Sequence, residues 1–235
     1  MTKKEVLTEL EAFGNEGTKK VFLKHGAKEP FYGVKVGDLK KIVKKVKVDH
    51  GLAKELYDTG NSDAMYLAGL ICDPAQMTMA DLNHWVKQAY WYMISEYTVA
   101  WVAAESNHGY EIALEWINSD DEMTAAAGWA TLSSLVSIKS DEELDLEKLG
   151  QLLDQVGEHI HEAPNRVRYT MNGFVIALGS YVTSLTQKSI AIAEKIGKVS
   201  VEMGGTACKV PPAPQYIRKV QDKGRIGKKR KMARC

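Results

Sequence analysis

The sequence predicts an all-α protein, built as a right-handed α-solenoid of antiparallel helix pairs. Apolar residues recur at helical spacing along nearly all of the 235-residue chain, whereas strand patterns are almost absent. Candidate pairs follow one another at uneven intervals of roughly 26 to 44 residues, a range that brackets known two-helix repeats. The second helix of each pair is rich in Ala, Gly and Ser, which let a neighbouring helix approach closely. Stacked pairs bury a continuous core and leave one surface concave. An irregular helical bundle is the alternative.

Two helices are expected to open the chain. Thr2 is suited to cap a helix that runs to about Phe13, and a second helix is expected over residues 15–25. Gly26 then ends the second helix, because glycine tolerates the left-handed backbone conformation found after many helices.

A third helix is expected over residues 37–46, with an apolar half and a cationic half. Its apolar residues recur at three- and four-residue spacing, and lysines take the remaining faces. Lys40, Lys44 and Lys47 fall on one face of this helix. The row is a candidate phosphate-contacting surface, and an ordinary solvated helix face is the alternative.

Four helix pairs follow this opening segment. The first helices are expected over residues 49–58, 78–89, 109–118 and 146–161. The second, small-residue helices are expected over residues 62–72, 95–106, 121–136 and 165–181. Each second helix begins at a polar residue that can cap it. Thr78 with Asp81 forms a near relative of the capping box.

The net charge of +1 conceals a strong asymmetry along the chain. Residues 1–47 carry a charge of +6, residues 48–211 carry −13, and residues 212–235 carry +8. A protein that needs charge only for solubility can intersperse the two signs. Positive ends that flank an acidic middle therefore indicate a polyanionic partner, touched by particular surfaces.

The sequence is expected to divide into a helical domain over residues 1–223 and a basic C-terminal tail over residues 224–235. Runs of like charge are often disordered, so a solvated tail is one interpretation. A flexible arm that reaches around a duplex is the other. Its candidate DNA-binding residues are Lys228, Lys229, Arg230 and Lys231.

Several classes of protein are disfavoured by what the sequence lacks. No stretch approaches the roughly 20 apolar residues of a membrane span, and the N-terminus has no signal-peptide pattern, so we expect a cytoplasmic protein without a membrane partner. The 3 cysteines are scattered and fit neither a disulfide framework nor a zinc site. Phosphate-binding glycine loops, zinc-protease motifs and α/β-hydrolase motifs are also missing. We predict no metal and no cofactor.

Aromatic residues are concentrated between Trp85 and Trp101. These two tryptophans lie at apolar helical spacing, which favours a packing role. Trp91 and Tyr92 lie in the connection between two helices, where functional residues are common. Glu96 follows in the first turn of the next helix, where a carboxylate either serves function or simply stabilises the helix N-terminus.

Three segments carry a resemblance to a known family. They read YGVKVGDLKKIVKKVK, AYWYMISEYTVAWV and YTMNGFVIALGSY. From about Thr2 to about Lys198, the chain resembles the DNA alkylation repair family, the HEAT-like repeat alkylpurine DNA glycosylases and their relatives. The resemblance implies a C-shaped solenoid of HEAT-like helix pairs whose basic concave face holds duplex DNA. It also implies excision of cationic N3- or N7-alkylated purines without flipping the base. We expect a nucleoid-associated monomer.

Active members of this family place two tryptophans and an aspartate at the lesion. The rings stabilise a cationic base by cation–π attraction, and the carboxylate stabilises the sugar cation and positions water. In one register, Glu96 matches the aspartate and Tyr92 the first tryptophan, with Trp91 beside it. A register shifted by one residue matches Ser95 and Trp91 instead. Phe174 matches the second tryptophan.

The basic residues of the family match only in part. A phosphate-gripping arginine has no counterpart in TAAAGWATL, where three alanines stand. Arg166 and Arg168 open the helix over residues 165–181, and residues two apart cannot face the same groove. We expect one to bind the DNA partner and the other to pair with an acid such as Glu162.

Three hypotheses follow for the function. The leading one is an alkylpurine DNA glycosylase that acts on alkylated double-stranded DNA, with Glu96, Trp91, Tyr92 and Phe174 as catalytic residues. The second is a catalytically inactive DNA-binding scaffold, which the missing arginine and the replaced indole favour. The third is a protein-interaction solenoid, which the acidic middle favours.

Overall fold

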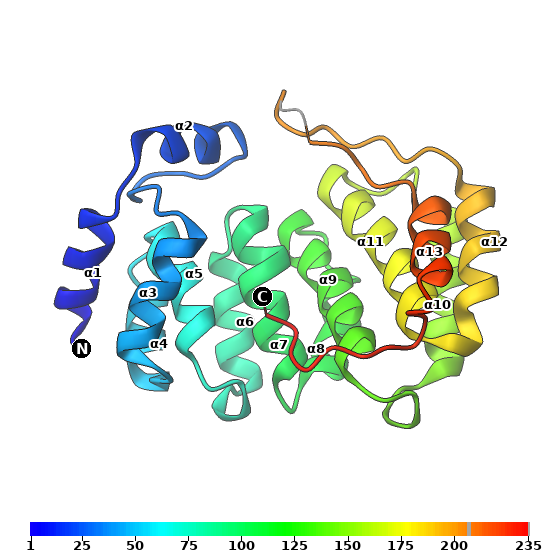
Figure 1. The fold of residues 1–235 in the computed structure, drawn as a ribbon, viewed down its shortest axis with the longest axis horizontal. Coiled ribbons are helices and arrows are strands. Elements are labelled where there is room, and N and C mark those ends of the chain that lie inside the picture. Colours follow the sequence, from blue (N-terminus) through cyan, green and yellow to red (C-terminus); the bar gives the residue numbers. More distant parts are fainter. Residues whose placement is uncertain (206–207, 235) are drawn as a thin grey trace.

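The computed structural model describes residues 1–205 and 208–234, and every regular element within these ranges is helical (Figure 1). The predicted all-α class is therefore confirmed. The α-helices are α1 (Lys3–Ala12), α2 (Glu16–Lys24), α3 (Val36–Val46), α4 (His50–Tyr57), α5 (Ser62–Ile71), α6 (Met79–Gln88), α7 (Ala100–Glu105), α8 (Gly109–Trp116), α9 (Glu122–Ile138), α10 (Leu146–His159), α11 (Asn165–Tyr181), α12 (Thr186–Ile196) and α13 (Ala213–Asp222). Short 3₁₀ turns are η1 (Pro74–Gln76), η3 (Asp141–Glu143) and η4 (Thr183–Leu185), and η2 (Met93–Val99) is π-helical.

The helices lie in a row of pairs that follows the order of the sequence (Figure 1). The four predicted pairs are α4/α5, α6 with the continuous segment of η2 and α7, α8/α9 and α10/α11, and α12/α13 forms a fifth. The fifth pair was not predicted because α13 buries only Ala213 and Ile217, which is too short an apolar pattern to stand out. No helix among the described residues is long and apolar enough to cross a bilayer.

Capping residues begin several helices as predicted, but among the second helices only α9 is capped by its predicted first residue, Asp121. Asn61 caps α5, and η2 and α11 have no side-chain cap. Thr2 accepts a hydrogen bond from the backbone N–H of Glu5 in a complete capping box, and Asn15 caps α2. Thr78 and Asp81 form the capping box that the sequence predicts. Helix starts are thus encoded locally, because a side chain satisfies N–H groups that lack a partner within the helix.

The small residues of the second helices lie where neighbouring helices meet, as expected. A Cβ on Gly69 of α5 would come 2.5 Å from the Thr98 methyl group. A Cβ on Gly128 of α9 would come 2.7 Å from the backbone nitrogen of Ile117, at the end of α8. Larger residues at either position would push the repeats apart.

The basic C-terminal segment is packed on the helices and is not the flexible arm or solvated tail expected from its charge. After α13, residues 225–234, here called the strap, run back across the C-terminal ends of α11, α9 and α7 (Figure 1). Its backbone nitrogens donate at each crossing: Gly227 to Ser180 O (3.0 Å), Arg230 to Ser137 O (2.7 Å) and Ala233 to Glu105 Oε1 (2.7 Å). Ala233 is fully buried. The last residue, Cys235, lies outside the described residues.

The cationic side chains of the strap bind carbonyl groups at the C-terminal ends of helices. Lys229 Nζ donates to the Val136 carbonyl (2.9 Å) and lies 2.8 Å from Asp141 Oδ1. The Arg234 guanidinium lies within hydrogen-bonding distance of three carbonyls at the end of α5, those of Gly69, Leu70 and Cys72. The C-terminal end of a helix carries partial negative charge, so cations are favourable there.

Candidate functional site

The site suggested by the sequence begins at a wide helical turn. Residues 93–99 form a π-helix, in which Thr98 Oγ1 donates to the Met93 carbonyl five residues earlier (3.4 Å). Such a turn holds one residue more than an α-helical turn and often marks a functional site. Ser95 and Glu96, the two residues between which the sequence leaves the register open, both lie in this turn.

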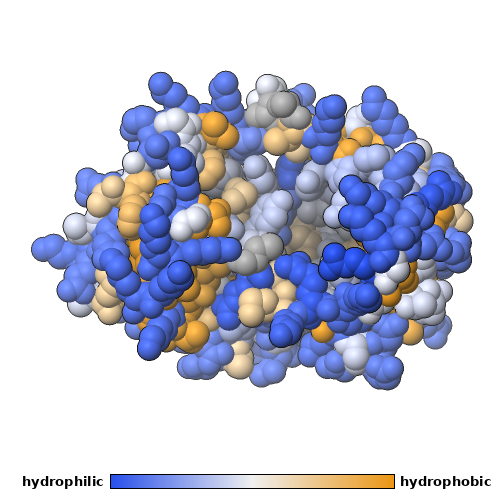
Figure 2. Space-filling view, in the orientation of Figure 1, coloured by the Kyte–Doolittle hydropathy of each residue, from blue (hydrophilic) through white to orange (hydrophobic). Residues whose placement is uncertain are grey.

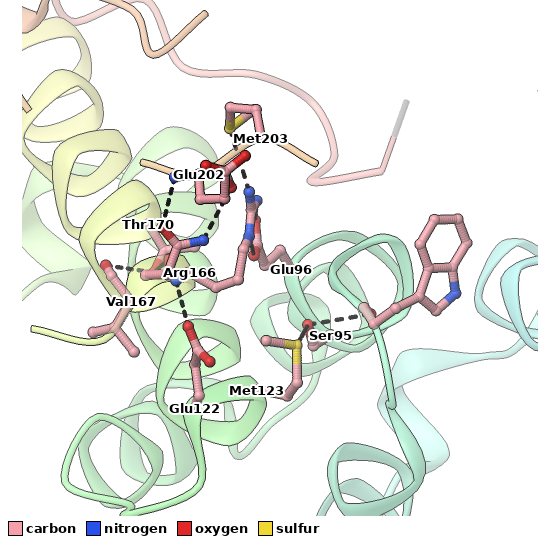
Figure 3. A network of polar contacts seen from close by, with 11 residues as sticks. Ser95, Glu96, Glu122, Met123, Arg166, Val167, Thr170, Glu202 and Met203 are labelled. Carbon is pink, nitrogen blue, oxygen red and sulfur yellow. Dashed lines mark hydrogen bonds and ion pairs between the residues drawn. The ribbon is translucent and has the colours of Figure 1, made fainter. Parts of the chain in front are cut away.

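Glu96 reaches the site and is tied to an arginine 70 residues later. Arg166 Nε donates to Glu96 Oε1 (2.7 Å) and its Nη2 donates to Oε2 (2.6 Å), as Figure 3 shows. The exposed fractions of the two side chains are 3% for Glu96 and 12% for Arg166. Both carboxylate oxygens therefore accept from one guanidinium, in a two-point geometry that is strong and specific.

Two tyrosine rings complete the surroundings of the Arg166 guanidinium. Its central carbon lies 4.6 Å from the centre of the Tyr92 ring and 4.4 Å from that of Tyr169. Guanidinium over an aromatic face is a favourable cation–π arrangement. Burial raises the pKa of Tyr92 to about 12 and also raises the pKa of Tyr169. Both rings are thus neutral phenols at physiological pH.

Further contacts hold both the backbone and the guanidinium of Arg166 in place. Its backbone N–H donates to Glu122 Oε1 (2.6 Å), and its Nη1 contacts the Met203 sulfur (3.7 Å). The segment that carries Met203 is held by Asn165, whose side chain exchanges two hydrogen bonds with the Glu202 backbone. The Arg166 cluster, defined as Tyr92, Glu96, Glu122, Arg166, Tyr169 and Met203, is covered by this segment.

Burial and the opposite charge of the partner shift the pKa values of Glu96 and Arg166 in opposite directions. Burial raises the pKa of Glu96 to about 7, although the hydrogen bonds and positive charge of Arg166 oppose the rise; the nearby Glu122 adds to it. Burial alone would lower the pKa of Arg166, but the Glu96 carboxylate more than offsets this and raises it. Arg166 therefore keeps its positive charge, and the site holds its own cation.

Two of the four predicted catalytic residues are core residues. Trp91 has an exposed fraction of 3%, and its indole N–H donates to Ser62 Oγ (2.9 Å). Phe174 is fully buried and packs on Trp129, with 5.2 Å between the ring centres. Both rings fill the interior between helices in this structure, and their role as walls of a ligand site stays a prediction.

The remaining aromatic residues divide as the sequence suggested. Trp85 and Trp101 are buried, which confirms their packing role. Tyr92 does reach the cluster, whereas Ser95 is buried and its hydroxyl contacts the Trp91 carbonyl (3.4 Å). Tyr169 was missed by the sequence analysis. Its position three residues after Arg166, on the same helix face, is the signal that points to it.

The two arginines of α11 both bind groups within the protein. Arg166 pairs with Glu96 and not with Glu162, which lies 3.5 Å from His159 Nδ1 instead. Arg168 Nε donates to the Ala163 carbonyl (3.2 Å), and its Nη1 donates to the backbone oxygen of residue 200 (3.0 Å). The expectation that one of the two is available to DNA is not met in this conformation.

The lysine row of α3 is available for a partner. Lys40, Lys44 and Lys47 are exposed, and none forms an ion pair in the part of the chain that the structure describes. Their neighbours differ, because Lys41 pairs with an aspartate of α3 (2.7 Å) and Lys45 with a glutamate of α1 (2.7 Å). The row thus keeps the role proposed for it from the sequence.

Comparisons with known proteins agree with the fold and the resemblance. The sequence profile of DNA alkylation repair enzymes matches residues 6–198. Two uncharacterized proteins, from Listeria innocua and Listeria monocytogenes, are each 35% identical to the chain over 222 residues, which is 92% of this chain and 96% of theirs. One solved structure covers 100% of both chains with 40% identity and a TM-score of 0.92. It represents a new family of proteins related to the HEAT-like repeat DNA glycosylases with affinity for branched DNA structures. The chain therefore has a HEAT-like repeat fold and belongs to the DNA alkylation repair enzyme family.

Proposed function

We propose that this protein binds DNA, with a preference for branched structures, and does not excise bases. The observation that carries the proposal is the Arg166 guanidinium, which fills the place between carboxylate and rings where a cationic base would have to bind. This is the second of the hypotheses drawn from the sequence.

The DNA-binding part of the proposal is supported by the relatives and by charge. The solved structure that is 40% identical comes from a family with affinity for branched DNA structures. The chain carries positive charge at both ends, and Lys40, Lys44 and Lys47 are exposed and form no ion pair in the described ranges. Cations on defined surfaces are the electrostatic signature of a nucleic-acid partner.

The absence of excision is supported because each of the four predicted catalytic side chains already binds another group of the protein or is buried. Both oxygens of Glu96 accept hydrogen bonds from Arg166, and Tyr92 faces the same guanidinium. Trp91 and Phe174 are buried. A cationic base entering this cluster would meet a like charge, and displacement of Arg166 would leave a buried carboxylate without its partner.

The test measures binding and base release on the same purified protein. Gel-shift titrations compare a four-way junction with a linear duplex of equal length and composition. Release of 3-methyladenine and 7-methylguanine is followed on methylated duplex DNA at saturating protein. We expect tighter binding to the junction, and release no faster than the spontaneous rate.

Two results would overturn the proposal in different ways. Base release above the spontaneous rate that is lost in Glu96→Gln would establish the leading glycosylase hypothesis instead. A protein that binds neither junction nor duplex at low salt would favour the protein-interaction hypothesis.

A further inference from the structure

A large basic groove lies away from the Arg166 cluster, at the other end of the second helices. It has a volume of about 930 Å³ and is bounded by α9 and α11 on one side and by α13 and the strap on the other. Figure 2 shows strongly hydrophilic side chains over α13 and the strap. We call this the basic groove.

The two sides of the basic groove differ in chemistry. The side formed by α13 and the strap supplies its cations: Lys219, Lys223, Arg225, Lys228, Lys229, Arg230 and Lys231. The side formed by α9 and α11 supplies small residues: Ser133, Ser134, Ser137, Gly173, Ala177 and Ser180. Among the described residues that line the groove, none is acidic. The groove thus combines dense positive charge with a floor that a bulky ligand can approach closely.

Most of these cations are not needed to hold the fold. Lys229 is the exception, because it binds Asp141 and the end of α9. The others include five exposed residues that form no ion pair within residues 1–205 and 208–234: Lys219, Lys223, Arg225, Lys228 and Lys231. Clustered like charges repel one another, so a fold that orders them without counter-charges is suited to an anionic ligand.

The strap holds these cations at the basic groove before any ligand binds. Its backbone is pinned at Gly227 and Arg230 by hydrogen bonds to the ends of α11 and α9. Lys228 and Lys231 each lie one residue from a pinned position. Cations on an ordered segment lose less conformational entropy on binding than cations on a free tail.

A buried hydroxyl provides an independent sign of a missing ligand. Ser180 lines the basic groove with an exposed fraction of 3%, and its Oγ has no hydrogen-bond partner in the structure. A buried polar atom without a partner is unfavourable, and a phosphate oxygen is an acceptor that would satisfy it.

We propose that the basic groove binds the phosphate backbone of one DNA arm. The proposal rests on the proposed function and names the surface that carries it. A row of cations above a small-residue floor matches a ligand with regularly spaced negative charges and a bulky backbone. Phosphate contacts of this kind position DNA without reading its sequence, which suits recognition of a branched shape.

The experiment compares two triple variants with equal loss of charge. The groove variant is Lys223→Gln/Arg225→Gln/Lys228→Gln, which leaves the strap anchors intact. The control variant is Lys87→Gln/Lys195→Gln/Lys198→Gln, at exposed lysines of the acidic middle that lie outside the groove and form no ion pair in the described part of the chain. Affinity for a four-way junction is measured as a function of salt, with thermal unfolding as a check on the fold.

The expected result follows from counterion release. Each phosphate contact adds about 0.9 to the slope of log affinity against log salt, so the groove variant should lower the slope by roughly 2.7. Its affinity at 0.1 M salt should fall by about a hundredfold or more, while the control stays near the wild type. Equal affinities of the two variants would overturn the groove inference and leave the proposed function standing. A wild type without junction binding would overturn the proposed function itself.

Discussion

The two ends of the second helices use charge in opposite ways. Where η2, α9 and α11 begin, Glu96 and Arg166 neutralise each other under a covering segment. Where α9 and α11 end, cations of α13 and the strap are exposed and outnumber the available acids. Acids near helix starts and cations near helix ends both follow the helix dipole. Only the second end retains charge that a partner can use.

The largest expected effect is on stability, from breaking the buried pair. Arg166→Met should lower the free energy of unfolding by about 3 kcal/mol or more, because Glu96 is left buried without its partner. Chemical denaturation measures this loss. Glu96→Gln/Arg166→Met should recover a large part of it, since no charge is then stranded. A double variant no more stable than Arg166→Met would show that the two side chains do not act as a pair.

A smaller loss of stability is expected from releasing the end of the strap. Arg234→Gln removes contacts with three carbonyls at the end of α5 and with Glu105, which should cost about 2 kcal/mol. Junction affinity should change little, because Arg234 does not line the basic groove. An unchanged midpoint of unfolding would mean that the strap does not brace the repeats.

The lysine row of α3 should contribute to DNA binding less than the basic groove does. Lys40→Gln/Lys44→Gln/Lys47→Gln is expected to weaken junction binding by about tenfold, the effect of roughly one phosphate contact. The thermal midpoint should stay unchanged, because all three side chains are exposed. A loss as large as that of the groove variant would place the main DNA contact at the opposite end of the solenoid.

A further expected effect is a change of stability with pH. Burial raises the pKa of Glu96 from 4.5 to about 7, so the folded protein binds this proton more tightly than the unfolded chain does. The contribution of Glu96 to the free energy of unfolding should therefore fall as the pH rises from about 4.5 to about 7, and then level off. Glu96→Gln should remove this part of the pH dependence. Identical pH profiles for the two proteins would contradict the raised pKa.

Local signals in the sequence were enough to place most helices. The helix over residues 165–181 was predicted with its observed ends, and Thr78 with Asp81 capped α6 as expected. The strap could not be predicted, because its order depends on helix ends far earlier in the sequence, such as the Val136 carbonyl that binds Lys229. Charge alone suggested a free tail.

The candidate site was harder to predict than the fold. A resemblance assigns the positions of the rings in the sequence, but it does not show that Trp91 is buried and donates to Ser62 of the preceding repeat. The partner of Glu96 lies 70 residues away, and sequence spacing gives no sign of such a pair. Tyr169 is the one member of the cluster that could have been predicted, because residues three apart on a helix lie on the same face and Tyr169 follows Arg166 by three.

One titration tests the contrast between the two ends most directly. Junction affinity is measured for the wild type, for Glu96→Gln/Arg166→Met, and for Lys223→Gln/Arg225→Gln/Lys228→Gln. The first two should bind alike, because the Arg166 cluster is internal, and the third should bind about a hundredfold more weakly or worse. If the folded double variant loses binding while the groove variant keeps it, the Arg166 cluster is the DNA site and the contrast drawn between the two ends is wrong.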